Sequence, residues 1–418
     1  MEDFNQLVDG YVVNLINHET TDFCDLILRL PGVYPSVALK SINRLNTQNL
    51  IPSELAKSFV EQSAKEKKYM ETTYEYKFKL PVPHPLDFEW RFSDTASSYL
   101  LNKCENLTGS IDNLIMLGTP SLFQYANERR KPNYKIHFMG DHTFVTSRLE
   151  EFCLDNITRC NVFYDIPNNI VGSHLILDPP WYDEFIYAFI WTAKQLCNIG
   201  GYLLVSLPAI GTRPGVIRER ENILKWANEL GLVLISIENS AIPYNTPFFE
   251  LNALRAEGIN NVPQEWRKGD LFIFRNDNNQ NTQKPEFSKG NGWTEAAIGN
   301  IRFKVRVDKS REYKEFADPS LNKIIDGDIL PTVSSKDERR SKAIVWTSGN
   351  RIYHCAGPDT LFKILQALEK NYPAEHALAN QIKRDLTDKE IILVNEAIKQ
   401  IMEIANIENK EYNYFYEV

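Results

Sequence analysis

The stretch SHLILDPPWYDEF, residues 173–185, joins a largely apolar run to an abrupt stop. The run SHLILD predicts a strand inside a sheet, with both faces of the strand covered. Pro179 and Pro180 end the strand, because neither has an N–H group to donate and each has a fixed φ. Open α/β sheets bind ligands beyond the carboxyl ends of their strands, and Asp178 stands at such an end. The stretch therefore predicts a rigid corner at a ligand-binding edge.

The side chains of this corner suit a planar amine. Asp178 can accept a hydrogen bond from an amino group, and Trp181 offers a flat face for stacking. An exocyclic amine must have its hydrogens drawn into acceptors, here the Asp178 carboxylate and a proline carbonyl, before its nitrogen can react. This chemistry needs no metal and only a weak base. A base inside a duplex would also have to be flipped out and stacked, which Trp181 would permit. The alternative interpretation is a tight turn, with Trp181 filling the core.

The totals are those of a soluble protein with more than one core. The chain has 418 residues, which predicts two or three domains, or one large domain with elaborated ends. No stretch approaches the roughly 20 apolar residues of a membrane span. The acidic start MEDFNQLVDGYVV lacks the layout of a secretory signal. We therefore predict a cytoplasmic protein outside the membrane. The net charge of -8 does not favour wholesale nucleic-acid binding, although a local basic groove is compatible with it.

Cysteine and histidine spacing gives no sign of a metal site. The six cysteines lie far apart, and no pair has the spacing of zinc knuckles or redox pairs. His142 and His174 have no partner at metal-ligand spacing. We expect reduced, mostly buried cysteines, no disulfide and no structural metal.

The pattern along the chain predicts four regions. Residues 1–76 carry apolar residues at helical spacing and predict a helical N-terminal region. Residues 77–276 alternate short β-branched and aromatic runs with amphipathic segments, which is typical of a doubly wound α/β sheet. Residues 277–300 are polar and rich in Asn, and predict a linker. Residues 301–418 predict an α+β region in which strands precede amphipathic helices.

Seven strands are expected between residues 77 and 276. In chain order they are NLIMLG (113–118), YKIHFMG (134–140), NVFYD (161–165), HLILD (174–178), GYLLVSL (201–207), LVLISIEN (232–239) and DLFIFR (270–275). Many nucleotide-binding folds have such a set of strands, so the strand count alone leaves the function open.

Several motifs resemble one enzyme family. DPPW matches the (D/N/S)PP(Y/F/W) motif of amino-methyltransferases that use S-adenosylmethionine. The wider run resembles the family labelled probable N6-adenine methyltransferase, which includes the lysine methyltransferase of elongation factor 1A and a zinc-finger ribosomal RNA adenine methyltransferase. The matching segments, spread over roughly residues 85–210, are FEWRFSDTASSYLL (88–101), IMLGTPSLFQYA (115–126), FMGDHTF (138–144) and NVFYDIPNNI (161–170).

The resemblance implies an enzyme of the class I methyltransferase fold. This is an α/β fold with a Rossmann-like, seven-stranded sheet, here carrying a helical N-terminal extension and an α+β C-terminal extension. It implies S-adenosyl-L-methionine as the methyl donor, bound across the carboxyl ends of the first strands. The catalytic residues would then be those of the corner, Asp178, Pro179, Pro180 and Trp181.

The resemblance also implies donor-binding residues, each with a local alternative. Gly118 and Thr119 would let the backbone approach the methionine part of the donor, and N–H groups near Ser121 would bind its carboxylate. Otherwise these residues are an ordinary helix N-terminus, capped by Ser121 or Thr119. Asp141 could accept both ribose hydroxyls, or be a turn residue. Asp165 could accept the adenine amino group of the donor, although IPNN beside it is also turn chemistry.

Two downstream segments are candidates for substrate binding. SLPAIGTRPG, residues 206–215, predicts a mobile flap in which Arg213 contacts a phosphate or an acidic side chain. IPYNTPFFELNALR, residues 242–255, falls where related enzymes place a substrate-recognition loop. Its aromatic residues could form a stacking platform or, equally, a hairpin packed on the sheet; they are Tyr244, Phe248 and Phe249.

Three functions remain open at this stage. The leading hypothesis is methyl transfer to the N6 amine of adenine in DNA or RNA, so that nucleic acid is the expected partner. The second is methylation of a protein lysine, whose ammonium group must first lose its proton. The third is a non-catalytic, methyltransferase-like scaffold that binds a protein partner through its terminal extensions. The intact corner from Asp178 to Trp181 argues against the scaffold.

Overall fold

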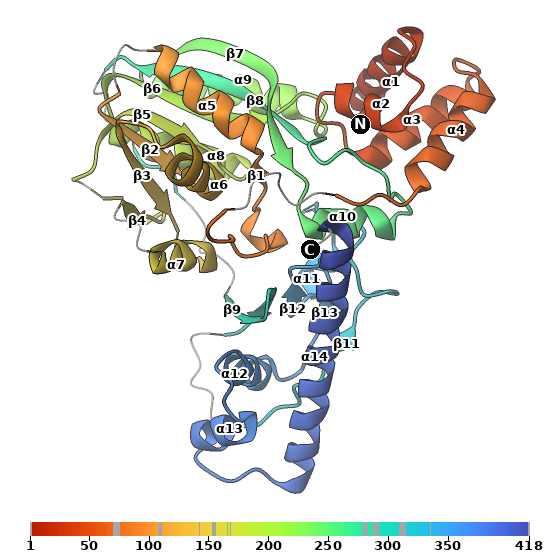
Figure 1. The fold of residues 1–418 in the computed structure, drawn as a ribbon, viewed down its shortest axis with the longest axis vertical. Helices are drawn as coiled ribbons and strands as arrows, with labels where there is room; N and C mark the ends of the chain where they lie inside the picture. Colours follow the sequence, from red (N-terminus) through yellow and green to blue (C-terminus); the bar gives the residue numbers. More distant parts are fainter. Residues whose placement is uncertain are drawn as a thin grey trace.

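A computed structural model describes residues 2–69, 76–107, 111–141, 143–152, 156–164, 166–167, 169–278, 283–286, 292–308, 315–334 and 336–416. An α/β body forms the upper part of the molecule in Figure 1, with the N-terminal helices beside it and the C-terminal region below. The longest helix, α14 (Asp388–Tyr416), runs from the far end of the C-terminal region back to the junction of the other two regions.

The main sheet has eight strands in the order β1-β7-β8-β6-β5-β2-β3-β4. Strands β2 to β6 are parallel where they pair, and β8 runs antiparallel to both β6 and β7. Without the short β1, the order matches the class I methyltransferase fold, so the predicted fold class is confirmed. The strands are β1 (Arg91–Phe92), β2 (Asn113–Leu117), β3 (Lys135–Gly140), β4 (Ile157–Arg159), β5 (Gly172–Leu177), β6 (Cys197–Pro208), β7 (Leu232–Asn245) and β8 (Lys268–Asn276).

Helices cover both faces of this sheet. Strand β5 shows the consequence, because Ile176 packs into the core under α5 and α6, whereas Leu175 and Leu177 pack into the core under α8 and α9. Such burial on both faces explains the nearly continuous apolar run of this strand. The helical segments are η1 (Pro85–Asp87), α5 (Asp94–Leu107), α6 (Pro120–Tyr125), η2 (Ala126–Arg130), α7 (Phe144–Glu151), α8 (Asp183–Leu196), α9 (Val216–Glu229) and α10 (Phe248–Ala256).

Two predicted strands differ from the observed ones. The third strand is β4, residues 157–159, and not NVFYD at 161–165. Asn161 explains the difference, because its side-chain oxygen accepts the N–H of Phe163 at 3.0 Å and closes a turn there. The sixth strand continues to residue 245, beyond the predicted 239, with a register shift between Glu238 and Ile242.

The N-terminal region is helical, as predicted, but it does not form a core of its own. Its helices are α1 (Glu2–Asn17), α2 (Phe23–Arg29), α3 (Pro35–Thr47) and α4 (Ser53–Ala64). Their apolar residues share one core with Phe248 and Leu251 of α10, with Trp266, and with Phe415 at the end of α14. The extension is therefore built onto the sheet region and onto the last helix.

The C-terminal region contains a second sheet of five strands, in the order β11-β13-β12-β10-β9. Its first strand lies within residues 277–300, so the predicted linker is too long. Trp293–Ile298 are not linker, because they pair antiparallel with Ile301–Arg306. The elements are β9 (Trp293–Ile298), β10 (Ile301–Arg306), β11 (Asn322–Lys323), α11 (Arg339–Lys342), β12 (Val345–Thr347), β13 (Ile352–His354), α12 (Pro358–Glu369) and α13 (Ala374–Ile382), followed by α14.

Among the described residues, no helix combines the length and the apolar composition that a membrane crossing requires.

Candidate functional site

The proline corner lies directly against the loop that follows β2. The N–H of Asp178 donates to the carbonyl of Leu117 at 3.3 Å, and the N–H of Gly118 donates to the carbonyl of Met139 at 2.8 Å. Gly118 has φ +70°, and a Cβ there would lie 2.8 Å from the Phe189 ring and 3.4 Å from the Asp178 carbonyl oxygen. Only glycine fits this position. The carboxyl ends of β2, β3 and β5 thus meet at one edge.

The Asp178 carboxyl group is held from one side. The Tyr244 hydroxyl donates to Asp178 Oδ1 at 2.6 Å and lies 2.6 Å from Ser206 Oγ. No group in the described part of the chain donates to Oδ2. Burial raises the pKa of Asp178 well above its ordinary value, and the hydrogen bond from Tyr244 lowers it in part. The ends of β5, β6 and β7 therefore place a carboxyl group with one oxygen fixed and the other available to a ligand.

Asp178 and the three residues after it line a cavity of about 940 Å³. The other walls come from parts of the chain that are far apart in sequence. The N-terminal region contributes Phe4, Tyr34, Val37 and Lys40, the segment before β1 contributes Phe88 and Trp90, and the C-terminal region contributes Pro331 to Ser334 and Lys336. The volume is that of an ordinary small-molecule site. Both terminal extensions are thus parts of the site.

Trp181 borders this cavity, and a hydrogen bond to its backbone carbonyl holds it in place. Its ring meets Tyr244 edge to face, with ring centroids 5.6 Å apart, and its Nε1 is buried without a hydrogen-bond partner among the described residues. Arg213 donates to the Trp181 carbonyl at 2.7 Å and pairs with Glu219 at 2.5 Å. Arg213 therefore contacts an acidic side chain of its own chain and stiffens the corner.

The segment predicted to be a mobile flap is packed against the N-terminal region. The N–H of Gly211 donates to the carbonyl of Pro31 at 3.1 Å. A Cβ on Gly211 would lie 2.5 Å from that oxygen, so the two loops touch backbone to backbone. Lys268 also donates to the carbonyl of Leu28. The Gly211 contact holds the predicted flap against the loop before α3, and the Lys268 contact joins β8 to α2.

The structure places the residues that were predicted to bind the donor, without testing that role. Thr119 is buried, and its hydroxyl neither caps α6 nor finds any described partner. An orphaned hydroxyl beside the narrow Gly118 loop fits a donor molecule that supplies the missing partner. Ser121 lies in the first turn of α6. Asp141 follows β3 and accepts a hydrogen bond from Asn161 at 3.0 Å. Asp165 lies outside the described residues, and its role stays a prediction.

The stacking platform is wrong for two of its three residues. Phe248 and Phe249 are 1% and 0% exposed. They begin α10, whose apolar side joins the core of the N-terminal region, and Phe249 packs edge to face against Trp90 at 5.2 Å. Tyr244 is also buried, but its hydroxyl reaches Asp178. The segment after β7 is thus a packed helix rather than an open recognition loop.

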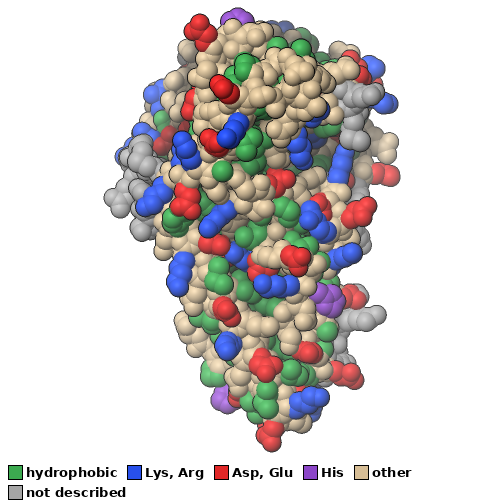
Figure 2. Space-filling model, turned by 90° about the vertical axis from the view of Figure 1, so that its right-hand side faces the viewer, with side chains coloured by type: hydrophobic (Ala, Val, Ile, Leu, Met, Phe, Trp, Pro, Cys, Tyr) green, Lys and Arg blue, Asp and Glu red, His purple; other side chains and the backbone are tan. Residues whose placement is uncertain are grey.

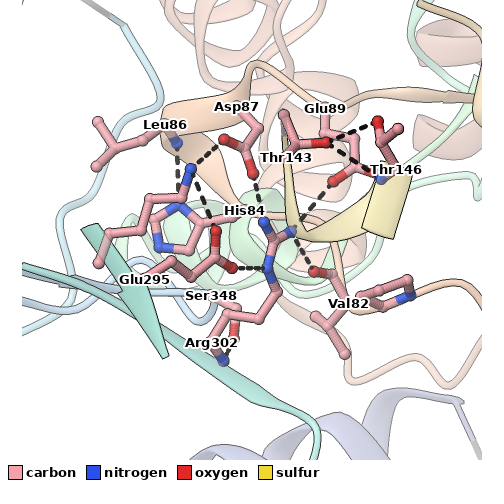
Figure 3. Close-up of polar contacts among 12 residues, drawn as sticks. Val82, His84, Leu86, Asp87, Glu89, Thr143, Thr146, Glu295, Arg302 and Ser348 are labelled. Carbon is pink, nitrogen blue, oxygen red and sulfur yellow. Dashed lines mark hydrogen bonds and ion pairs between the residues drawn. The ribbon is translucent and has the colours of Figure 1, made fainter. Parts of the chain in front are cut away.

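A buried arginine from the second sheet holds the segment around Phe88, which lines the cavity. Figure 3 shows the polar contacts of this arginine. Arg302 of β10 pairs with Asp87 at 2.5 Å, with Glu89 at 3.2 Å and with Glu295, and it donates to the Val82 carbonyl at 2.9 Å. This set of contacts is called the Arg302 clamp below. Its partners lie more than 200 residues away along the chain, except Glu295, so sequence reasoning missed it.

The Arg302 clamp holds both neighbours of a strained residue. Phe88, between Asp87 and Glu89, has φ +53°, which is unfavourable for a bulky residue. Its ring lines the cavity and meets Tyr182 edge to face at 5.0 Å. Strain of this kind persists where surrounding contacts over-determine it, commonly at ligand sites. The aromatic motif FEWRF thus marked a segment that lines the cavity, but the sequence could not show that Arg302 holds this segment in place.

A neutral histidine, His84, lies beside the Arg302 clamp. Its Nδ1 accepts the N–H of Leu86 at 3.1 Å, and its Nε2 lies 3.1 Å from the Trp346 carbonyl, so the ring proton is on Nε2. Burial, together with Lys304 and Arg302 nearby, lowers the pKa of His84 well below its ordinary value. The histidine thus stays uncharged beside two cations.

No cluster of three or more His, Cys, Asp or Glu side chains suited to a metal ion occurs in the described ranges.

Comparison with known proteins gives similarities of fold. No protein-family model and no curated protein matches the sequence. The solved branched-chain polyamine synthase of Thermus thermophilus is 10% identical, covering 68% of this chain and 91% of that one with a TM-score of 0.48. The N-methyltransferase NodS of Bradyrhizobium japonicum WM9 is 12% identical, covering 44% and 94%, with a TM-score of 0.30. NSun6 of Pyrococcus horikoshii is 17% identical, covering 44% and 52%, with a TM-score of 0.30. At these identities the likeness concerns the fold alone.

Proposed function

We propose that the protein is an S-adenosylmethionine-dependent methyltransferase that modifies an amino nitrogen. One observation carries the proposal: the half-satisfied Asp178 carboxyl group borders a cavity, and its backbone touches the Gly118 loop that would hold the donor. Nucleophile and donor must be held in contact distance for direct transfer. The Asp178 corner and the Gly118 loop are adjacent, so an amine held by the first would lie beside a donor held by the second.

The residues of the corner would orient the amine. Asp178 Oδ2 and the Pro179 carbonyl accept the amine hydrogens, while Tyr244 keeps Oδ1 fixed. This directs the nitrogen lone pair toward the Gly118 side. When bound, S-adenosylmethionine supplies an electrophilic methyl group, whose bond to sulfur breaks as the nitrogen–carbon bond forms. The proton lost from nitrogen passes to Asp178 or to water.

For the acceptor, we propose the N6 amine of adenine. Aromatic side chains support a planar group, because Trp181, Phe88 and Trp90 all line the cavity. Planar bases stack on such faces. The adenine can belong to DNA, to RNA or to a smaller molecule.

A second candidate acceptor is an aliphatic amine such as a protein lysine. Acidic side chains favour it, since Asp183, Glu184, Glu219 and Glu257 border the cavity, and the adjacent Arg213 is already paired. Figure 2 adds that Lys and Arg side chains on the face it shows are interspersed with Asp and Glu rather than gathered. Polyanion-binding surfaces are usually basic patches.

The test measures donor binding and methyl transfer separately. Calorimetry should detect S-adenosylmethionine binding to the wild type and, within about threefold, to Asp178→Asn. Transfer of labelled methyl groups, tried with nucleic acid and with cell-extract protein, should fall at least about 100-fold in Asp178→Asn. Label in nuclease-sensitive material supports adenine, and label in protein supports lysine. A wild type that binds no donor would leave only the scaffold hypothesis.

A further inference from the structure

Arg267, just before β8, is buried but only partly satisfied. Its side chain is held by Glu250 of α10, with Nε 3.2 Å from Oε2 and NH2 paired to Oε1. Glu250 is 0% exposed and Arg267 is 8% exposed. The third nitrogen, NH1, makes no hydrogen bond to any described group. Arg267 is almost wholly enclosed, so a guanidinium edge left open there is available to water or to a ligand.

Indole rings fix the plane of the Arg267 guanidinium. Its carbon lies 4.8 Å from the ring centroid of Trp90, 4.9 Å from Trp266 and 5.9 Å from Trp181. The Nε1 of Trp90 also donates to Glu250 Oε2 at 3.0 Å, which orients the carboxylate. Arg267, Trp90 and Trp181 all line the cavity of the Asp178 corner. The arginine is therefore rigid, and its open edge borders the cavity.

Further donors at this cavity also have no partner. The Tyr34 hydroxyl, the Trp181 Nε1 and the Thr212 hydroxyl are buried, make no hydrogen bond to described groups, and belong to residues that line it. Tyr34 packs edge to face against Trp266, with centroids 5.5 Å apart, and so stands beside the Arg267 group. Glu250, the carboxylate that pairs with Arg267, already accepts hydrogen bonds from Arg267 and Trp90. Donors without a described partner therefore remain beside Arg267, although Glu257 also lines the cavity and interacts electrostatically with Tyr34.

We propose that Arg267 and Tyr34 form a subsite for an oxyanion, a phosphate or a carboxylate, carried by the acceptor molecule. The inference rests on the proposed function, because it takes the cavity to be the acceptor site. A guanidinium edge and a hydroxyl donate to such oxygens, whereas the Asp178 end accepts from an amine. The acceptor is therefore a molecule that carries both an amine and an oxyanion. A purely cationic amine would leave the Arg267 subsite unsatisfied.

Equilibrium binding to matched pairs of small probes tests this subsite. Adenosine 5′-monophosphate is compared with adenosine, and lysine with 1,5-diaminopentane, by calorimetry without any donor present. In one pair, the probe with the oxyanion should bind the wild type about 10- to 100-fold more tightly. The pair that shows the preference identifies the source of the oxyanion.

Variants assign the preference to the subsite. Tyr34→Phe removes an unpartnered hydroxyl, so the protein should keep its stability while the preference falls about fivefold or more. Arg267→Gln combined with Glu250→Gln replaces the ion pair by two neutral amides, and the preference should disappear. Tyr353→Phe, which removes a hydroxyl bonded to Asp328 at 2.9 Å in the second sheet, is the matched control and should keep the preference.

The outcomes separate this inference from the proposed function. No oxyanion preference in either pair, or a preference that survives Arg267→Gln with Glu250→Gln, overturns the subsite. Failure to bind S-adenosylmethionine overturns the proposed function, yet the probe measurements need no donor and remain decisive for the subsite. Binding of donor with no preference among the probes would keep the methyltransferase and remove the subsite alone.

Discussion

Two buried arginines in this protein differ in how fully they are satisfied. Arg302 faces three carboxylates and a backbone carbonyl, and its nitrogens all have partners. Arg267 has one carboxylate, and NH1 is left without a described partner. Both are enclosed by protein, but only Arg267 lines the cavity. Saturation of the guanidinium, rather than its burial, thus distinguishes Arg302, which holds the fold, from Arg267, which we propose as part of a ligand subsite.

The largest expected effect is that of Arg302→Met on stability. The substitution leaves Asp87, Glu89 and Glu295 buried around an apolar side chain, with Lys304 as their remaining cation. The free energy of unfolding, measured by urea denaturation, should fall by about 3 to 5 kcal/mol. Arg302→Lys keeps the charge and should lose less. A loss below about 1 kcal/mol would show that the clamp is not structural.

Arg267→Met should lose about 3 kcal/mol in the same measurement, because Glu250 stays buried without its cation. At this site a second substitution should restore the free energy of unfolding. Adding Glu250→Leu removes the orphaned charge, and the double variant should recover most of the loss. No single carboxylate substitution can do this for Arg302→Met, since three carboxylates surround that site. Equal recovery at both sites would erase the distinction between them.

A third buried arginine, Arg351, has a carboxylate partner whose titration makes the stability of the protein depend on pH. Arg351 pairs with Asp328, Glu408 and Glu411, and burial raises the pKa of Glu408 to about 7 from an ordinary 4.5. Between these pH values the folded protein holds a proton that the unfolded chain has lost. The free energy of unfolding should therefore decrease as pH rises from 4.5 through 7, by about 2 to 3 kcal/mol.

Glu408→Gln isolates that dependence. The amide cannot titrate, so the variant's free energy of unfolding should change less over the same pH range than that of the wild type. Identical slopes in urea denaturation series at several pH values would mean that Glu408 is ionised throughout.

The smallest expected effect belongs to Trp90→Phe. The ring remains over Arg267, but the donor to Glu250 Oε2 is lost. A hydrogen bond to a charged group contributes about 1.5 to 3 kcal/mol at most, and Arg267 still holds the carboxylate, so a loss of about 1 kcal/mol is expected. Denaturation of Trp90→Phe in the Glu250→Gln background should show a smaller loss, because the acceptor is no longer charged.

Local sequence predicted the corner because its determinants are adjacent in the chain. The apolar run, the acid and the prolines of residues 173–181 are enough to end a buried strand at an open edge. Gly118 and Asp141 follow their strands for the same reason. The sheet order needed only the count and sequence of the strands together with the family resemblance.

Contacts over long sequence separations could not be predicted in this way. Tyr244 reaches Asp178 only because β7 continues past its predicted end. Phe248 and Phe249 have the composition of an exposed aromatic platform, but their helix is covered by a core assembled from both terminal regions. Ion pairs such as Arg302 with Asp87 join residues 215 positions apart, and no periodic pattern marks them.

At the end of α14, Phe415 enters the core of helices α1 to α4. Its carbonyl accepts the N–H of Tyr69 at 2.6 Å, and the Tyr416 hydroxyl donates to the Thr246 carbonyl at 3.0 Å. On the ribosome, residue 415 emerges tens of seconds after residue 64, at roughly 5 to 20 residues per second. Helices α1 to α4 are therefore made well before α14, and the apolar surface that Phe415 covers stays exposed in the meantime. A chaperone that shields nascent chains should raise the yield of folded protein.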